Sequence, residues 1–153
     1  MGSKRELRWW VKNAGEGLPT TFDDVWHTRV QEIHTDASGY GYGSTEGLWG
    51  LWEAEERDWI IAIKEMEAVR RQLCKMKPGT KARIGVDNTV VYWTLKRGRS
   101  FSWDLNNLIR RIGGDVKARH LEIDFEWIPT EENRADWVSR CKTRPQFASR
   151  YYL

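Results

Sequence analysis

Residues 33–43 read IHTDASGYGYG, in which a short apolar run leads to Asp36 and is followed by a run rich in glycine. The apolar run predicts a strand over residues 31–38, and the glycine-rich run predicts a second strand over residues 39–45. Residues 47–53 carry large apolar residues after a turn and predict a third strand. Because short links join these strands, they are expected to form an antiparallel meander with Asp36 on its first strand.

After the meander, helical and extended patterns alternate along the chain. Apolar residues recur at three- and four-residue steps over residues 59–76, which predicts the clearest helix. The further elements expected are a strand over Lys81–Val86, helices over residues 89–95 and 103–112, the latter ended by Gly113-Gly114, a strand over residues 121–127, and a short last helix with Asn133 as its N-cap and Asp136 as its third residue. Since both later strands are reached through helices, they should lie parallel to a neighbour by right-handed crossovers. The expected fold class is α/β, with a mixed five-stranded sheet and helices on its faces.

Four acidic residues stand out because each lies in a short motif of its own: Asp36, Glu65, Asp87 and Asp136. Asp36 and Asp87 end apolar strand-like runs, whereas Glu65 and Asp136 lie where helices are expected. Carboxylates that converge from separate elements suit a divalent metal site, and hard oxygen donors favour Mg²⁺ or Mn²⁺ over zinc. Two such ions about 3.5–4 Å apart are a general arrangement for the cleavage of phosphodiesters.

Each of these carboxylates also has a purely structural interpretation. A single Asp after a strand is most often a turn or cap residue, and Asp136 could complement the dipole of its helix. Glu67 competes with Glu65 for the sheet edge, because helical geometry sets them about 200° apart and only one can face it. Glu131 and Glu132 are expected to be solvated loop charges, although either could approach the metals.

In this order and on these elements, the motifs resemble the ribonuclease H fold and the type 1 ribonuclease H active site. The features that carry the resemblance are TDAS at residues 35–38, EMEAV at residues 65–69, VDN at residues 86–88, and the spaced pattern IP, N, AD and SR within residues 128–140. The match covers roughly residues 31–141 and is most similar to the ribonuclease H domains that follow reverse transcriptases in DIRS-like and gypsy-like retroelements. The resemblance implies an endoribonuclease that cleaves the RNA strand of RNA·DNA hybrids with two Mg²⁺ ions, for which Mn²⁺ can substitute.

The resemblance also implies a role for each acid. Asp36 would bridge both metals, Glu65 and Asp87 would complete one site, and Asp136 would complete the other, opposite Asp36. Glu65 is implied in preference to Glu67, because the glutamate of the family precedes a residue pair that ends in alanine. Since clustered carboxylates repel one another, the group is expected to be loosely arranged without metal and to contain raised pKa values.

One feature departs from many type 1 enzymes, which carry a histidine in the loop before the last aspartate. Residues 130–135 contain no histidine. His120 is expected to be a surface residue, and His34 is expected to point to the face of its strand opposite Asp36. The departure bears on the rate of turnover and not on the type of reaction.

Nucleic-acid contacts are expected from a basic loop that contains Lys96, Arg97 and Arg99, with Trp103 nearby. A comparable loop grips the DNA strand in some family members, and such contacts would be made to phosphates and would be sensitive to salt. The alternative is a solvated loop between two helices. Ser38 and Asn88 adjoin catalytic positions and could bond to ribose 2′-hydroxyls, which distinguish RNA from DNA.

The whole chain, at 153 residues, is long enough for one domain. Residues 1–30 are expected to be an arm or linker toward the polymerase part of a reverse transcriptase, and residues 142–153 a tail. The net charge of +3 is compatible with a polyanionic partner such as an RNA·DNA hybrid. No apolar run approaches the roughly 18 residues of a membrane span, so no membrane partner is expected.

The two cysteines, Cys74 and Cys141, form no zinc-binding pattern. A reduced, intracellular location in cytoplasm or nucleus is the simplest interpretation, and a single disulfide is the alternative.

Two other functions stay open beside the nuclease. A catalytically silent domain of this fold could bind nucleic acid or scaffold a polymerase, although the complete set of acids argues against it. An integrase or resolvase would use a different acidic order. Cleavage of a hybrid, as opposed to transfer of a DNA strand, would separate these functions.

Overall fold

The central element of the structure is a five-stranded mixed sheet. The computed structural model describes residues 30–146. The strands stand in the order β3-β2-β1-β4-β5. Their bounds are Gln31–Ala37 (β1), Gly41–Ser44 (β2), Trp49–Leu51 (β3), Lys81–Val86 (β4) and Glu122–Trp127 (β5). The first three strands pair antiparallel, whereas β4 runs parallel to β1 and β5 runs parallel to β4. The predicted fold class and the predicted meander are confirmed.

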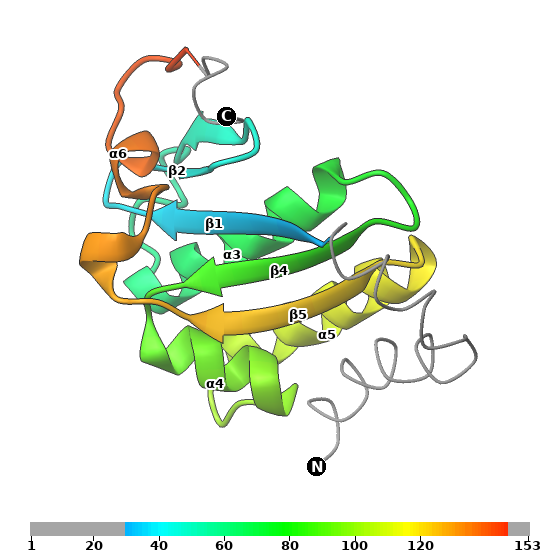
Figure 1. The fold of residues 1–153 in the computed structure, drawn as a ribbon. Coiled ribbons are helices and arrows are strands. Elements are labelled where there is room, and N and C mark those ends of the chain that lie inside the picture. Colours follow the sequence, from blue (N-terminus) through cyan, green and yellow to red (C-terminus); the bar gives the residue numbers. More distant parts are fainter. Residues whose placement is uncertain (1–29, 147–153) are drawn as a thin grey trace.

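Helices flank the sheet on both faces (Figure 1). Their bounds are Ile61–Lys75 (α3), Thr89–Arg97 (α4), Trp103–Ala118 (α5), the short 3₁₀ helix Thr130–Glu132 (η1), and Asp136–Ser139 (α6). α3 and α5 pack together over one face, α4 packs beside β5, and α6 lies against β1 and β2 on the other face. Within residues 30–146, no helix is long and apolar enough to cross a membrane.

The core forms on the face of the sheet that α3 and α5 cover. Ile33, Ile84 and Phe125 come from three adjacent strands, are at most 2% exposed, and belong to one cluster with Met66 and Ile112. Burial of each such side chain stabilises the fold by about 1.5–3 kcal/mol. Because strand side chains alternate between faces, the even-numbered positions of β1 are left free for other contacts.

The carboxyl ends of the parallel strands meet at one edge of the sheet. In Figure 1 the arrowheads of β1, β4 and β5 point the same way and end beside α6 and η1. Asp36 is the last residue but one of β1, and Asp87 follows directly after β4. Open α/β sheets bind ligands at this edge, outside the carboxyl ends of their strands.

A glycine in β2 allows α6 to approach the sheet closely. A Cβ atom at Gly43 would collide with the side chain of Val138. Gly43 is also the residue that pairs with Asp36 across the two strands. The short last helix can therefore lie directly over the end of β1, because position 43 carries no side chain.

The third predicted helix runs further than expected. Gly113-Gly114 was predicted to end it at residue 112, but α5 continues to Ala118. Leu105, Ile109 and Val116 bury one face of the helix along its whole length. Each glycine costs about 1 kcal/mol of helix propensity, and this burial outweighs that cost.

The second helix, α4, also extends beyond its predicted end at residue 95. It stops at Gly98, which has a left-handed φ of 71° and donates its N–H to the carbonyl of Thr94. Lys96 and Arg97 therefore form the last helical turn and do not belong to a loop. The other bounds differ from the predicted ones by a few residues, as helix and strand ends commonly do.

Replacing Gly114 by alanine should stabilise the protein. An added Cβ at this exposed helical position meets no atom within 4 Å, so the change should raise the free energy of unfolding by about 0.5–1 kcal/mol. Gly98→Ala is the matched control, because its left-handed conformation disfavours a side chain and should make that variant less stable than the wild type. Denaturant titration measures both, and a loss of stability in Gly114→Ala would contradict an uninterrupted α5.

Candidate active site

Three carboxylates from three separate elements converge at the edge described above. One carboxylate oxygen each from Asp36, Glu65 and Asp87 lies within 4.8 Å of the other two. Asp36 and Glu65 are buried, and Asp87 is half-buried. This acidic triad joins β1, α3 and the end of β4, as the sequence motifs predicted for these three residues.

The two carboxylate oxygens of Glu65 differ in their hydrogen bonding. Its Oε1 accepts a hydrogen bond from the backbone N–H of Ala37 at 3.0 Å. Within the described part of the chain, the buried Oε2 accepts no hydrogen bond. Since its neighbours are carboxylates, only a proton shared with Asp36 or a cation can satisfy that oxygen. The donor set, made of carboxylate oxygens alone, fits a hard divalent cation.

Glu67 is directed elsewhere, which resolves the choice between the two glutamates. Its carboxylate bonds to Arg70 at 2.7 Å and to Arg71 at 2.7 Å. Burial alone would raise the pKa of Glu67, but the hydrogen bonds from these two arginines lower it below its ordinary value. Arg71 also bonds to Glu56 and lies over the ring of Tyr42, so this network anchors α3 to the meander.

The acidic triad carries raised pKa values. Burial, opposed by a hydrogen bond from Ser139 and reinforced by the charges of Asp87 and Asp136, raises the pKa of Asp36 from 3.8 to about 7. Burial and the nearby charges of Asp36 and Asp87 raise the pKa of Glu65 well above its ordinary value. Burial and the charge of Asp136 also raise the pKa of Asp87, against a hydrogen bond from Asn133.

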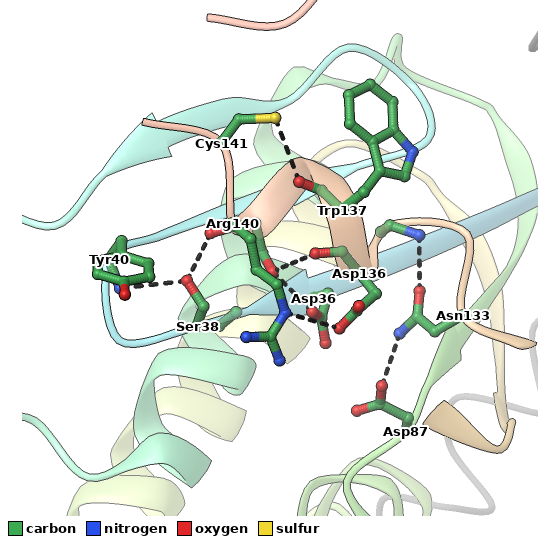
Figure 2. A network of polar contacts seen from close by, with 12 residues as sticks. Asp36, Ser38, Tyr40, Asp87, Asn133, Asp136, Trp137, Arg140 and Cys141 are labelled. Atoms are coloured by element: carbon green, nitrogen blue, oxygen red, sulfur yellow. Dashed lines mark hydrogen bonds and ion pairs between the residues drawn. The ribbon is translucent and has the colours of Figure 1, made fainter. Parts of the chain in front are cut away.

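Asp136 lies beside the acidic triad without belonging to it. Its charge acts on Asp36 and on Asp87, and its Oδ1 accepts a bond from Nε of Arg140 at 3.3 Å. Figure 2 shows the carboxylates of Asp36 and Asp136 close together below α6, next to the Arg140 side chain. The fourth predicted acid is thus brought to the same edge by the last helix.

The start of α6 differs from the prediction. Ala135, and not Asn133, is the N-cap, and Asp136 is the first helical residue instead of the third. Asn133 stands two residues before this N-cap. Its side chain donates hydrogen bonds to the carbonyl of Thr35 and to the carboxylate of Asp87. The residue is therefore part of the site's surroundings, a role that the capping interpretation missed.

The face predicted for His34 is wrong. Residues two apart on a strand share a face, and His34 and Asp36 both contact the segment that contains α6. His34 Nδ1 accepts a hydrogen bond from the backbone N–H of Arg134 at 3.0 Å, and burial together with the charge of Arg134 lowers the pKa of His34. Glu131 and Glu132 are exposed, as expected of solvated loop charges, and His120 is exposed too.

The predicted basic loop is divided between buried and exposed residues. Lys96 is 4% exposed and pairs with Asp124 of β5 at 2.8 Å, so it is not available at the surface, contrary to the prediction. Arg97 and Arg99 are exposed, and Trp103 is 77% exposed. The cause is the extra turn of α4, which points Lys96 toward the sheet.

Two further predicted contact residues already have hydrogen bonds. Ser38 Oγ donates to the backbone carbonyl of Ser139 and accepts from the N–H of Gly41 at 3.2 Å. The side chain of Asn88 accepts from the N–H of Val91 and so caps α4. Asn88 directly follows Asp87, and Ser38 stands two residues after Asp36.

A groove of about 720 Å³ lies along α4, from Thr89 to Arg97, and the segment that follows the helix. Its lining includes Val90, Trp93, Arg97, Arg99 and Phe101. Trp93 and Phe101 are exposed, and the guanidinium of Arg97 lies 5.3 Å from the centre of the Trp93 ring. The prediction omitted both aromatic residues, although the four-residue spacing of Trp93 and Arg97 on a helix could have indicated them.

Both cysteines have free thiols. Cys141 donates to the carbonyl of Trp137 at 3.2 Å, and Cys74 lies between Arg70 and Asp115. The alternative of a disulfide between them is therefore not realised in this structure.

Comparison with solved structures assigns the fold. The N-terminal RNase H domain of Rv2228c from Mycobacterium tuberculosis, solved as a fusion with maltose-binding protein, superposes with a TM-score of 0.51. The match covers 72% of this chain and 91% of that chain at 17% sequence identity. The chain has a ribonuclease H-like fold. No protein-family model and no curated protein matches the sequence. The assignment of this fold therefore rests on the structural comparison alone.

The acidic triad should make the metal-free protein less stable as the pH rises. Burial and nearby charges raise the pKa of Asp36 to about 7 in the folded state, whereas it is near 3.9 in the unfolded state. The folded state therefore binds more protons between about pH 4 and pH 7, so its stability falls across that interval and the loss is complete above about pH 7. Asp36→Asn should therefore raise the free energy of unfolding at pH 8 by about 2–4 kcal/mol in EDTA. At pH 4 it should change little.

Thermal unfolding of the two proteins at several pH values tests this sign. Asp104→Asn, at an exposed acid in the first turn of α5 and outside the acidic triad, is the control and should not gain stability at pH 8. Equal stabilities of Asp36→Asn and wild type at pH 8 would show that Asp36 is not under electrostatic strain.

Proposed function

We propose that this ribonuclease H-like domain is a metal-dependent endoribonuclease that cleaves the RNA strand of RNA·DNA hybrids. The observation that carries the proposal is the acidic triad at the carboxyl edge of the sheet, with Asp136 beside it. The order of the four acids and the motifs around them, which resemble the type 1 active site, support the same reaction. Perturbed pKa values cluster at functional sites, and the raised pKa values of these acids agree with the proposal.

The residues present fit divalent cations. All four side chains offer hard oxygen donors, and a cation could satisfy the unpartnered Oε2 of Glu65 in place of a proton shared with Asp36. We propose that Asp36 contributes to two sites, that Glu65 and Asp87 complete one of them, and that Asp136 completes the other. Mg²⁺ or Mn²⁺ bound in this way would lower the pKa of an attacking water and neutralise charge on the leaving oxygen.

The protein's own groups orient these acids. The backbone N–H of Ala37 holds Glu65, Ser139 Oγ donates to Asp36, and Asn133 Nδ2 donates to Asp87. Such second partners fix the direction in which a carboxylate presents its remaining lone pairs. These hydrogen bonds oppose the repulsion that was expected to loosen the cluster.

The groove beside α4 is proposed to hold the nucleic acid. Its two exposed arginines can contact phosphates, and its exposed aromatic rings can contact sugars or bases. Trp103 lies just beyond it, at the start of α5, and is proposed to extend the same surface. Ser38 and Asn88 are kept as proposed neighbours of the scissile nucleotide.

The wider context is proposed from the motifs. Their resemblance to retroelement domains suggests that the natural protein includes a reverse transcriptase polymerase and acts inside the cell. Neither the fold nor the acidic triad depends on that context.

Glu65→Gln should abolish cleavage of an RNA·DNA hybrid, whereas Glu67→Gln should retain it. Loss of an outer partner of a metal ligand already costs about 10–100-fold, so loss of a ligand itself should lower the rate by at least about 100-fold. Glu67→Gln loses two ion pairs and some stability, but its carboxylate faces away from the acidic triad. Cleavage of an end-labelled hybrid in Mg²⁺ or Mn²⁺ measures both, with Asp36→Asn and Asp87→Asn as further inactive variants.

Single-stranded RNA, duplex RNA and duplex DNA serve as controls in the same assay and should stay intact. If the folded wild type binds the hybrid and leaves it uncut, the domain is a binding or scaffolding module. Transfer of a DNA strand in place of hydrolysis would favour an integrase-like enzyme.

Arg97→Ala and Arg99→Ala should weaken hybrid binding without changing the maximal rate. Each lost phosphate contact should raise KM and reduce the slope of log affinity against log salt by about one. Arg83→Ala is the matched control, because Arg83 pairs with Glu32 away from the α4 groove and should leave KM unchanged. If all three variants behave alike, the groove does not contact the hybrid.

A further inference from the structure

We propose that Asn133 and Ser139 are positioning residues that set the place of Asp136 relative to Asp36 and Asp87, and through it the affinity of the site for divalent cations. The inference rests on the proposed function, because it concerns the same group of acids. It goes beyond that function by assigning a role to two uncharged residues that would not themselves be metal ligands.

Asn133 links the segment before Asp136 to two parts of the site. The side chain is buried, and its Nδ2 donates to the carbonyl of Thr35 at 3.0 Å and to Asp87 Oδ2 at 3.1 Å. Its Oδ1 accepts from the N–H of Ala135 at 2.9 Å. Both hydrogens of the amide and its oxygen are therefore engaged, as Figure 2 shows for the bond to Asp87.

Ser139 links the segment after Asp136 to the site, as Asn133 links the segment before it. It is fully buried, and its Oγ donates to Asp36 Oδ2 at 2.7 Å. Its own carbonyl accepts a hydrogen bond from Ser38 Oγ. The hydroxyl and the backbone of one residue thus attach the end of α6 to the end of β1.

Asn133 and Ser139 flank Asp136 in the sequence, so their hydrogen bonds restrict the position of Asp136. Asn133 and Ser139 each stand three residues from Asp136, one on either side. α6 has only four residues, and a helix of that length does not hold its own shape in water. Asp136, whose side chain is 37% exposed, is therefore placed by the buried residues on either side of it.

Each of the two residues donates to a different member of the acidic triad. Ser139 is bonded to Asp36, and Asn133 is bonded to Asp87. A shift of α6 would change the separation between Asp136 and both carboxylates at once. The side chain of Val138 also packs closely against Gly43 of β2, which further restricts the position of α6.

Calorimetric titration of Mn²⁺ into the metal-free 153-residue chain, without nucleic acid, tests the proposal. Ser139→Ala and Asn133→Ala should each weaken Mn²⁺ binding about 10–100-fold, as loss of an outer partner of a metal site does. Ser139→Cys should lie between Ser139→Ala and wild type, because a thiol is a weaker donor of similar shape. It also provides the test if Ser139→Ala does not fold.

Ser44→Ala is the matched control. Ser44 is likewise fully buried and donates to Gln72 Oε1 at 2.6 Å, but its bond leads to α3 and not to an acid. It should lose stability as Ser139→Ala does and still bind Mn²⁺ within about twofold of the wild type. In hybrid cleavage, an excess of Mn²⁺ should restore the rate of the positioning variants, as expected for weakened cation binding.

Unchanged Mn²⁺ affinity in folded Asn133 and Ser139 variants would overturn the positioning role. An equal loss in Ser44→Ala would overturn it too, because the effect would then reflect stability alone. If the wild type itself binds no Mn²⁺, the proposed function fails first, and the titration separates that outcome from the other two.

Discussion

Carboxylates gathered at one edge of a sheet repel one another, and burial makes that repulsion stronger. In this structure each acid is held against the repulsion by a donor from a different place. A backbone N–H after β1 holds Glu65, a hydroxyl at the end of α6 holds Asp36, and an amide before α6 holds Asp87. Burial and the charges of Asp87 and Asp136 still raise the pKa of Asp36 to about 7. A divalent cation bound there, as proposed, would replace the shared proton and remove the repulsion.

The sheet separates stability from chemistry by the alternation of its side chains. Odd-numbered residues of β1 build the core against α3 and α5, and the even-numbered Asp36 faces α6. The two glutamates of α3 are separated likewise: Glu65 belongs to the acidic triad, and Glu67 pairs with arginines that hold the helix in place. Substitutions in the core would consequently lower stability, whereas changes at Asp36, at Glu65 or at their hydrogen-bond partners would alter the site.

The sequence predicted those features that depend on local periodicity. The two-residue repeat of the strands and the motifs around Asp36, Glu65 and Asp87 were enough to predict the sheet and the acidic triad. The burial of Lys96 depends on Asp124, which is 28 residues further along the chain, so no local pattern could reveal it. The continuation of α5 through Gly113-Gly114 depends on packing in the same way. The orientation of His34, by contrast, followed from the strand repeat and was misjudged.

The bond between Ser139 and Asp36 joins residues 103 positions apart in the chain. Contacts between residues so far apart form late in folding, because the entropic cost of closing a large loop must be met before the contacts stabilise the fold. During synthesis the end of α6 leaves the ribosome long after β1, so the acids cannot assemble until nearly all of the described chain has emerged. Asp36 therefore lacks its hydroxyl partner until the chain has been synthesised as far as Ser139.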